Sequence, residues 1–378
     1  QTAADTNIWC LVCGDLGAVD VGLNILLFIP LGIGLSLMGV SRPRALVIVG
    51  LTTLTVEVLQ LSIITGRDAS LSDLLTNSAG GMLGIWLAPG LSRLVFPSPV
   101  VALRLAAGGI ILWLLQQTFA AWALERRPTD SVYYGQWAPE LAQFDRFTGT
   151  VSRVTLNGLP LGSGRFAESD VVRGELARPS FEVNVGARSG TLTERTAPIF
   201  SIFDDHQREI LLLGASRRDL VFHLRTRLDG LRLRSPSIVL PGAIPENPDQ
   251  PLAIRVKYDG AVYHLDARDP RAEVAGNVRV SASWGWSFVL PFAHNFGPGT
   301  PWLTMLWLAG FWVPIGYWAG RSGGRASVWW TIIALTFLIG LAGVPAGFGL
   351  QIGATSEWAA ALIGALAGWA FHRLHNRR

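Results

Sequence analysis

The stretch "LTTLTVEVLQLSIITGRDASLSDLLTNSAGGMLG", residues 51–84, begins and ends as apolar helix but is polar in its middle. About 20 apolar residues suffice for a helix to cross a bilayer. The polar groups here are Glu57, Gln60, Arg67, Asp68, Asp73 and Asn77. An ionised side chain at the centre of a membrane helix costs about 2.5–3.5 kcal/mol on insertion scales. The stretch therefore predicts two membrane helices whose polar groups point into a bundle.

The composition of the whole chain is also that of a membrane protein. Of its 378 residues, 50% are hydrophobic and 15% are charged. The chain contains no basic run interleaved with aromatic residues, so we expect no nucleic-acid partner. Cys10 and Cys13 form a single Cys-x-x-Cys, which offers too few ligands for a tetrahedral zinc site. A disulfide and two free thiols remain as alternatives for this pair.

Six apolar runs are long enough to be candidates for membrane helices, and a seventh, at residues 358–371, is short, so it starts earlier, near Gly353, or is partly re-entrant. They cover residues 19–38, 45–64, 71–95, 100–124, 302–320, 326–350 and 358–371. We therefore predict an α-helical transmembrane bundle of about seven helices. Four helices form an N-terminal membrane domain (residues 1–125), and the others lie in a C-terminal membrane portion (residues 293–378).

The positions of the arginines predict the orientation, because cytoplasmic loops retain basic residues. If successive helices alternate in direction, the basic loops and the basic end of the chain all fall on one side of the membrane. These basic residues are Arg42, Arg44, Arg93, Arg321 and Arg325 and the tail "HRLHNRR". We expect a multi-pass protein of the plasma (inner) membrane. Its residues 126–292 are extracytoplasmic, and the loop that holds Arg67 faces the same outer side.

Residues 126–292 show a two-residue period instead of long apolar runs. In "SFEVNVGAR" the apolar Phe181, Val183 and Val185 alternate with the polar Glu182 and Asn184. Many short alternating segments separated by turn signals are typical of an antiparallel sandwich. We predict an all-β sandwich domain inserted between the two membrane portions.

The two membrane portions resemble each other at an offset of 284 residues. Pro30, Gly80 and Gly84 then coincide with a proline and two glycines, and Asp73 coincides with Glu357. Chance similarity between apolar sequences is the alternative to a degenerate repeat. At the positions of Glu57, Gln60 and Asn77 the second portion has Leu341, Val344 and Ala361. A second copy would keep the packing glycines and lose most of the polar chemistry.

The polar side chains of the first three predicted helices share one depth below the outer surface. The rise of 1.5 Å per residue converts the distance of each residue from the outer end of its helix into a depth. The residues at the shared depth are Asn24, Glu57, Gln60, Asp73 and Asn77, and Arg67 and Asp68 lie above them. We predict a ligand-binding pocket open to the outside. The structural alternative is that these groups only cross-link helices, and it is favoured for Asp73, which begins a helix. For Glu57 the functional interpretation is favoured, because intramembrane acids are usually functional.

At these residues the chain resembles the VanZ-like membrane family. The resemblance rests on "NILLFIPLG" (residues 24–32), Glu57-x-x-Gln60 and "GRDASLSDLLTNSAGG" (residues 66–81). It covers roughly residues 19–95. The family contributes to glycopeptide-antibiotic resistance, so the resemblance implies a role in the cell envelope without implying a reaction.

The insert resembles concanavalin A-like and laminin G-like sandwiches in the rhythm of its strands. That resemblance implies binding of carbohydrate or protein, in some members with calcium. The segment "FDDHQRE" contains Asp204 and Asp205, which would be the calcium ligands, but it reads better as a solvated loop. We predict no metal site and no cofactor.

Recognition of a membrane lipid, an envelope glycan or a lipid-linked glycan is the leading functional hypothesis. The sandwich would hold the sugar, and the pocket around Glu57 would hold the membrane-proximal polar group. Arg67 is the natural partner for an anionic headgroup. A membrane-embedded enzyme acting on a lipid-linked substrate and a transporter are the alternatives. No residue is assigned a catalytic role.

Overall fold

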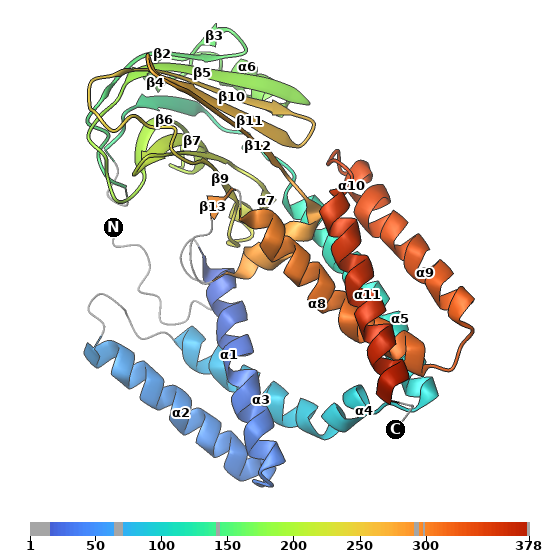
Figure 1. Ribbon diagram of the computed structural model, residues 1–378. Coiled ribbons are helices and arrows are strands. Elements are labelled where there is room, and N and C mark those ends of the chain that lie inside the picture. The colour runs from blue at the N-terminus through green and yellow to red at the C-terminus, as the bar shows by residue number, and fades with distance from the viewer. Residues whose placement is uncertain (1–15, 64–70, 141–143, 291–294, 298, 376–378) are drawn as a thin grey trace.

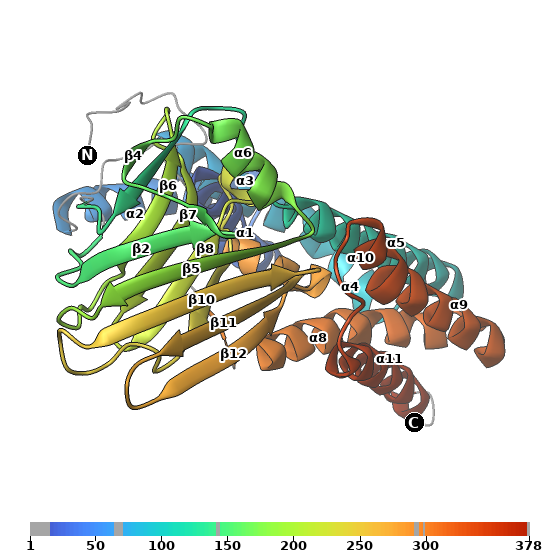
Figure 2. The same cartoon turned by 90° about the horizontal axis from the view of Figure 1, so that it is seen from above.

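The structure is a computed structural model that describes residues 16–63, 71–140, 144–290, 295–297 and 299–375. A β-sandwich lies at one end of the molecule, and two groups of helices extend from it (Figure 1). Viewed along the perpendicular direction, the strands and the C-terminal helices occupy separate regions (Figure 2). The helices and the sandwich therefore form distinct parts of the fold.

The N-terminal helical unit consists of three helices that pack together. They are α1 (Gly17–Leu37), α2 (Arg42–Ile63) and α3 (Leu71–Leu87). Helix α3 contacts both α1 and α2. A short 3₁₀ turn η1 (Ala88–Gly90), α4 (Leu91–Val95) and the long α5 (Pro99–Ala123) follow and lead to the sandwich.

The C-terminal helical unit is built around α8 and α11. Its elements are α8 (Thr300–Arg321), α9 (Ala326–Leu338), the π-turn η3 (Ile339–Gly343), α10 (Val344–Gly347) and α11 (Thr355–His375). Helix α5 packs on α8. Trp113 of α5 meets Trp312 of α8 edge-on, with ring centroids 5.1 Å apart, and Phe337 of α9 packs against Trp312 at 4.5 Å. These aromatic rings fill the centre of the unit.

Glycines bring α1 and α3 into backbone contact. A Cβ atom at Gly80 would overlap the carbonyl of Ile25, and one at Gly84 would overlap the carbonyl of Ile29. Gly32 makes the reciprocal contact from α1, against the backbone of Gly81. Small residues allow this close approach, which gains van der Waals contact in a setting where the hydrophobic effect does not drive helices together.

The same contacts recur between α8 and α11. Gly364 faces the carbonyl of Ala309, Gly368 faces that of Val313, and Gly316 faces that of Ala365. Each of these residues lies 284 positions after its counterpart in the N-terminal unit. The helix bounds obey the same offset, since α2 and α9 begin at Arg42 and Ala326, and α3 and α11 begin at Leu71 and Thr355.

The prediction of about seven spanning helices is not supported. Within the described residues, three helices are long and apolar enough to cross a membrane: Gly17–Leu37, Pro99–Ala123 and Ala326–Gly347. Helix α3 has only 17 residues. Helix α8 is long enough, but its tryptophan, glycine and proline residues add little to its mean hydropathy. Each of the seven predicted runs contains a helix within the described residues, and the runs at residues 71–95 and 326–350 are interrupted by η1 and η3.

Two sheets form the predicted sandwich. The seven-stranded sheet has the order β13 (Asn295–Phe296), β9 (Ser237–Leu240), β8 (Asp219–Leu224), β7 (Glu209–Ser216), β6 (Ala197–Asp204), β1 (Tyr133–Trp137) and β4 (Gly164–Arg165). The six-stranded sheet has the order β12 (Glu273–Arg279), β11 (Val262–Arg268), β10 (Pro251–Asp259), β5 (Ser180–Arg188), β2 (Thr150–Leu156) and β3 (Leu159–Pro160). Strand β13 pairs in parallel with β9, and the other pairings are antiparallel.

The core of the sandwich follows the alternation of the sequence. Phe181, Val183 and Val185 of β5 are buried between the sheets, and the residues between them face outward. Helices α6 (Ser169–Ala177) and α7 (Arg227–Gly230) and the 3₁₀ helix η2 (Ala282–Val289) complete this part. Helix η2 contacts α1, α5 and α8, and it therefore connects the sandwich to both helical units.

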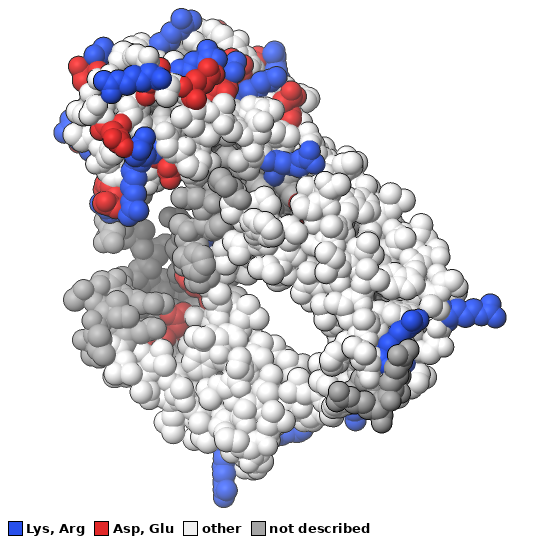
Figure 3. Space-filling model, in the orientation of Figure 1, with Lys and Arg blue, Asp and Glu red and all other residues white. Residues whose placement is uncertain are grey.

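Charged side chains gather on the sandwich and are sparse on the helices (Figure 3). The visible charges at the far ends of the helices are basic. An apolar belt between two polar ends is the surface expected of a protein that crosses a bilayer.

We expect Gly80→Ala to destabilise the protein, because the added Cβ would force the backbone of α1 away from α3. Overpacking of this kind costs about 1–3 kcal/mol. Gly34→Ala in α1 is the matched control, since no atom lies within 4 Å of its added Cβ. Thermal unfolding of the purified variants, followed by tryptophan fluorescence, measures the difference. Equal melting temperatures for the two variants would contradict the assigned contact.

Candidate functional site

A hydrogen-bonded group joins α1 to the start of α3. The side-chain amide of Asn24 donates to Oδ1 of Asp73 at 2.8 Å and to the hydroxyl of Thr76 at 3.3 Å. Thr76 in turn donates to the carbonyl of Ser72 at 2.8 Å. Two of the predicted pocket residues, Asn24 and Asp73, are therefore in direct contact.

Two further predicted residues are buried on the neighbouring helices. Glu57 of α2 is 7% exposed, and Asn77 of α3 is 4% exposed. Within the described part of the chain, Oδ1 of Asn77 has no hydrogen-bond partner. A buried amide oxygen without a partner is costly, which makes Asn77 a candidate for contact with a ligand.

The remaining predicted residues cannot be placed as side chains. Gln60 lies in α2, but its side chain is outside the described residues, as are Arg67 and Asp68. Cys10 and Cys13 also lie outside them. We call the described part of the set, Asn24, Glu57, Asp73 and Asn77, the polar cluster.

A cavity of about 730 Å³ lies between the seven-stranded sheet and the beginning of α1. Leu16, immediately before α1, lines it from the helical side. The charged residues and histidines that line it are Arg208, Arg225, Arg232, Arg234, His206, His223, Glu209 and Asp229. We call it the basic cavity. Arg208 is paired with Asp204 outside the lining, which leaves three arginines against two acids, a balance suitable for an anion.

Arg234 fixes one wall of the basic cavity. Its Nε donates to the carbonyl of Leu290 at 3.0 Å, and its backbone N–H donates to the carbonyl of Phe288. Burial lowers the pKa of Arg234, and the negative charge of Asp20 in α1 opposes that shift. Arg234 therefore links the cavity electrostatically to the first helix of the polar cluster.

His223 lines the cavity together with two carboxylates, Glu209 and Asp229. Nδ1 of His223 lies 2.6 Å from Oε1 of Glu209, and Nε2 lies 3.6 Å from Oδ1 of Asp229. Burial by itself would lower the pKa of His223. The hydrogen bond and charge of Glu209, with the charge of Asp229, outweigh burial and raise this pKa above its ordinary value.

The acidic loop at Asp204 and Asp205 has a structural explanation. Ligand-type atoms of Asp204, Asp205 and His206 lie within 4.8 Å of one another. However, the carboxylate of Asp204 accepts hydrogen bonds from Arg208 Nε at 2.7 Å and from Thr129 at 3.0 Å. It also accepts from the backbone N–H groups of His206 and Arg208. These donors stabilise the turn after β6.

A polar grid covers the outer face of the six-stranded sheet. Arg255 of β10 lies opposite Asn184 of β5 on one side and Asp266 of β11 on the other. Its Nε donates to Asp266 Oδ2 at 2.9 Å. A depression of about 600 Å³ follows this face, and Arg153 and Glu182 also line it. We call this surface the outer polar face.

The chain has long apolar helices with buried polar groups, and a β-sandwich lies at one end of them. These features define it as a membrane protein with a β-sandwich domain. Residues 2–94 match the family model VanZ/LLP1. The match includes all seven residues of the predicted pocket. No curated protein and no solved structure matches the chain. The sandwich lies outside the family match, and its likeness to concanavalin A-like domains stays a prediction.

The raised pKa of His223 predicts how stability depends on pH. Folding favours protonated His223, so this contribution is fully present below the ordinary histidine pKa of about 6.5. It is lost as the pH rises through the raised value of the folded state. We expect the melting temperature of the wild type to fall by a few degrees across this interval relative to His223→Gln. Parallel melting curves of the two proteins at every pH would contradict the pairing of His223 with Glu209.

Proposed function

We propose that this protein recognises an envelope lipid with an anionic headgroup. The observation that carries the proposal is the basic cavity itself, whose lining combines arginines of the sandwich with Leu16 at the start of α1, the helix that also carries Asn24. An anionic group in this cavity would meet arginines of the sandwich, and the start of α1 would border it through Leu16. The VanZ/LLP1 match supports a function in the cell envelope with a link to glycopeptide resistance.

The chemistry of the cavity favours a phosphate or a similar anion. Arginine offers a planar fork of donors that matches the oxygens of phosphate and carboxylate. Protonated His223 would add a further positive charge to the cavity. Glu209 and Asp229 reduce the net charge and hold His223 in place, so the cavity would accept a single anionic group in preference to a highly charged polymer.

The polar cluster would read the uncharged part of the headgroup. Asp73 and Glu57 supply acceptors, and Asn77 supplies a carbonyl oxygen that has no partner within the described residues. A hydroxyl or ammonium group of the ligand would donate to the Asn77 carbonyl oxygen. Arg67, which lies outside the described residues, stays the sequence-based candidate for pairing with the anionic group.

The outer polar face would hold a glycan. Sugar hydroxyls both donate and accept hydrogen bonds, and the grid of Arg255, Asp266 and Asn184 offers both kinds of group at regular strand spacing. This face lies on the side of the sandwich away from the helices (Figure 1). A lipid-linked glycan could therefore contact the protein at two levels, the headgroup at the membrane and the sugar on the sandwich.

The proposed topology is multi-pass, with the sandwich outside the cell. The support is the position of the basic loop residues, Arg42, Arg44, Arg321 and Arg325, which lie at the ends of helices remote from the sandwich. Cytoplasmic loops are the ones that retain such residues. Helices α2, α3, α8 and α11 would then lie in the membrane together with the three helices that meet the length and hydropathy requirement.

The double variant Arg225→Gln/Arg234→Gln tests headgroup recognition. We expect native mass spectrometry of the wild type to show a retained anionic lipid, phosphatidylglycerol being the probe that is added. Loss of charged hydrogen bonds worth about 1.5–3 kcal/mol each should lower its occupancy by roughly tenfold or more. Glu57→Ala should also weaken retention.

Arg217→Gln is the matched control for that experiment, because Arg217 pairs with the exposed Glu194 and lies outside the basic cavity. Its lipid occupancy should equal that of the wild type. Equal retention by all variants, or equal retention of zwitterionic phosphatidylcholine, would overturn the proposed recognition of an anionic headgroup.

Cysteine labelling tests the proposed topology. The background is a protein in which Cys10 and Cys13 are replaced by alanine. A membrane-impermeant maleimide should label Arg217→Cys on the sandwich in intact cells. It should label Ser41→Cys, between α1 and α2, only after the membrane is permeabilised. The reverse pattern would place the sandwich in the cytoplasm and exclude the proposed site.

A further inference from the structure

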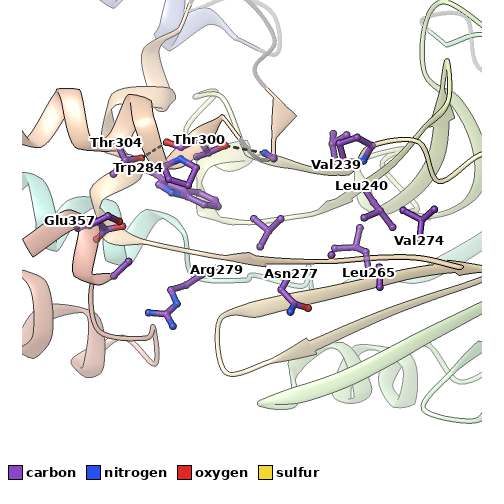
Figure 4. Close-up of a pocket in the computed structure, with 18 residues that line it drawn as sticks. Val239, Leu240, Leu265, Val274, Asn277, Arg279, Trp284, Thr300, Thr304 and Glu357 are labelled. Carbon is purple, nitrogen blue, oxygen red and sulfur yellow. Dashed lines mark hydrogen bonds between the residues drawn. The ribbon is translucent and has the colours of Figure 1, made fainter. Parts of the chain in front are cut away.

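A second cavity, of about 520 Å³, lies where the sandwich meets the C-terminal helical unit. Strands β9, β11 and β12 line it from the sandwich, and α8 and α11 line it from the helices (Figure 4). Its volume falls in the range of about 300–1,000 Å³ that is typical of small-molecule sites. We call it the junction cavity. It shares no lining residue with the basic cavity.

The two ends of the junction cavity differ in chemistry. The sandwich end of the cavity, between β9 of one sheet and β11 and β12 of the other, is apolar. It is lined by Val239, Leu240, Leu265 and Val274 (Figure 4). The other end lies at the tops of the helices and carries Glu357. An apolar end of this kind favours hydrocarbon, because apolar surface is then removed from water.

Glu357 is held as a polar anchor at the helical end. It is 6% exposed, and its Oε2 accepts hydrogen bonds from the hydroxyls of Ser281 at 2.9 Å and Ser283 at 3.1 Å. The positive charge of Arg279 acts on the same carboxylate. Arg279 also donates to the carbonyl of Ile352 at 3.3 Å, which places its guanidinium beside the start of α11. A buried acid and an exposed arginine therefore lie together at this end.

The junction cavity and the basic cavity occupy corresponding positions on the two helical units. Leu16 lines the basic cavity, and Thr300, at the offset of 284, lines the junction cavity. Glu357 is the counterpart of Asp73 at the same offset, and each acid lies in the first turn of its helix. The same offset relates the glycine contacts of both units. Two cavities of opposite character thus lie over equivalent helix ends.

We propose that the junction cavity binds one hydrocarbon chain of a membrane phospholipid. The chain leaves the bilayer and enters the space between the sheet edges, while the phosphate lies near Arg279. A headgroup hydroxyl or ammonium donates to Glu357. The bilayer around α8 and α11 is the source of the lipid, and both helices contribute lining residues to the cavity.

Photo-crosslinking of the full chain tests this site. The protein is reconstituted into phosphatidylcholine vesicles that contain phosphatidylglycerol with a diazirine at the end of one acyl chain. After irradiation and digestion, we expect crosslinks on β9 and β12, at residues 239–241 and 274–278. A chain end that stays in the bilayer cannot reach these strands. Crosslinks confined to the helices in the wild type would overturn the proposal.

Two variants separate filling of the cavity from general damage. Val278→Trp places a large ring in the cavity and should reduce the β9 and β12 crosslinks at least tenfold. Glu273→Trp, on the outward face of the same strand, should leave them unchanged. Unchanged crosslinking in a folded Val278→Trp protein would also contradict the proposal.

The crosslinks on β9 and β12 do not depend on lipid binding in the basic cavity. Glu57→Ala and Arg225→Gln/Arg234→Gln should leave the β9 and β12 crosslinks intact. If the wild type retains two lipids, and these variants lose one of them but keep the crosslinks, both sites stand. If the wild type retains an anionic lipid in the basic cavity but gives no crosslink on the sandwich, only the junction cavity fails.

Discussion

The rest of the structure depends on the backbone contact between α1 and α3, where Gly80 and Gly84 face the carbonyls of Ile25 and Ile29. Within lipid, helices gain little from hydrophobic association, so close packing through small residues has to hold them together. This contact brings Asn24 against Asp73 and buries Asn77. The equivalent contact of α8 with α11 supports the second unit, where Glu357 takes the place of Asp73. The close helix contact at the glycines lets these polar groups bond to one another, which lowers the free-energy cost of burying them.

The sandwich lies at one end of both helical units (Figure 1). Arginines in the loops next to β7, β8 and β9 line a cavity at the start of α1. Apolar side chains of β9, β11 and β12 line a second cavity with α8 and α11. The same small domain therefore presents two chemically opposite surfaces to two similar helical units. One basic and one apolar cavity suit an amphipathic ligand, because its headgroup and its hydrocarbon chain require opposite environments. It also explains why η2 contacts helices of both units.

Much of the architecture follows from the sequence because it depends on local periodicity. The apolar runs identified the helices, and the alternation around Phe181 and Val183 identified the sandwich. The apolar runs overestimated the number of helices that are long and apolar enough to span a membrane, since α3 has only 17 residues and the tryptophan, glycine and proline residues of α8 add little to its mean hydropathy. The basic cavity was not predictable. Arg208, Arg225 and Arg234 are separated along the chain, and only strand register and the contact with α1 bring them together.

An experimental structure of the protein in a lipid nanodisc that contains phosphatidylglycerol is the most direct test of the central claim. The account predicts a lipid headgroup bound against Arg225 and Arg234, with its polar part directed toward Asn77 and the sandwich on the outer side of the bilayer. A basic cavity filled by protein side chains alone, with ordered lipid only along the outer surfaces of the helices, would contradict it.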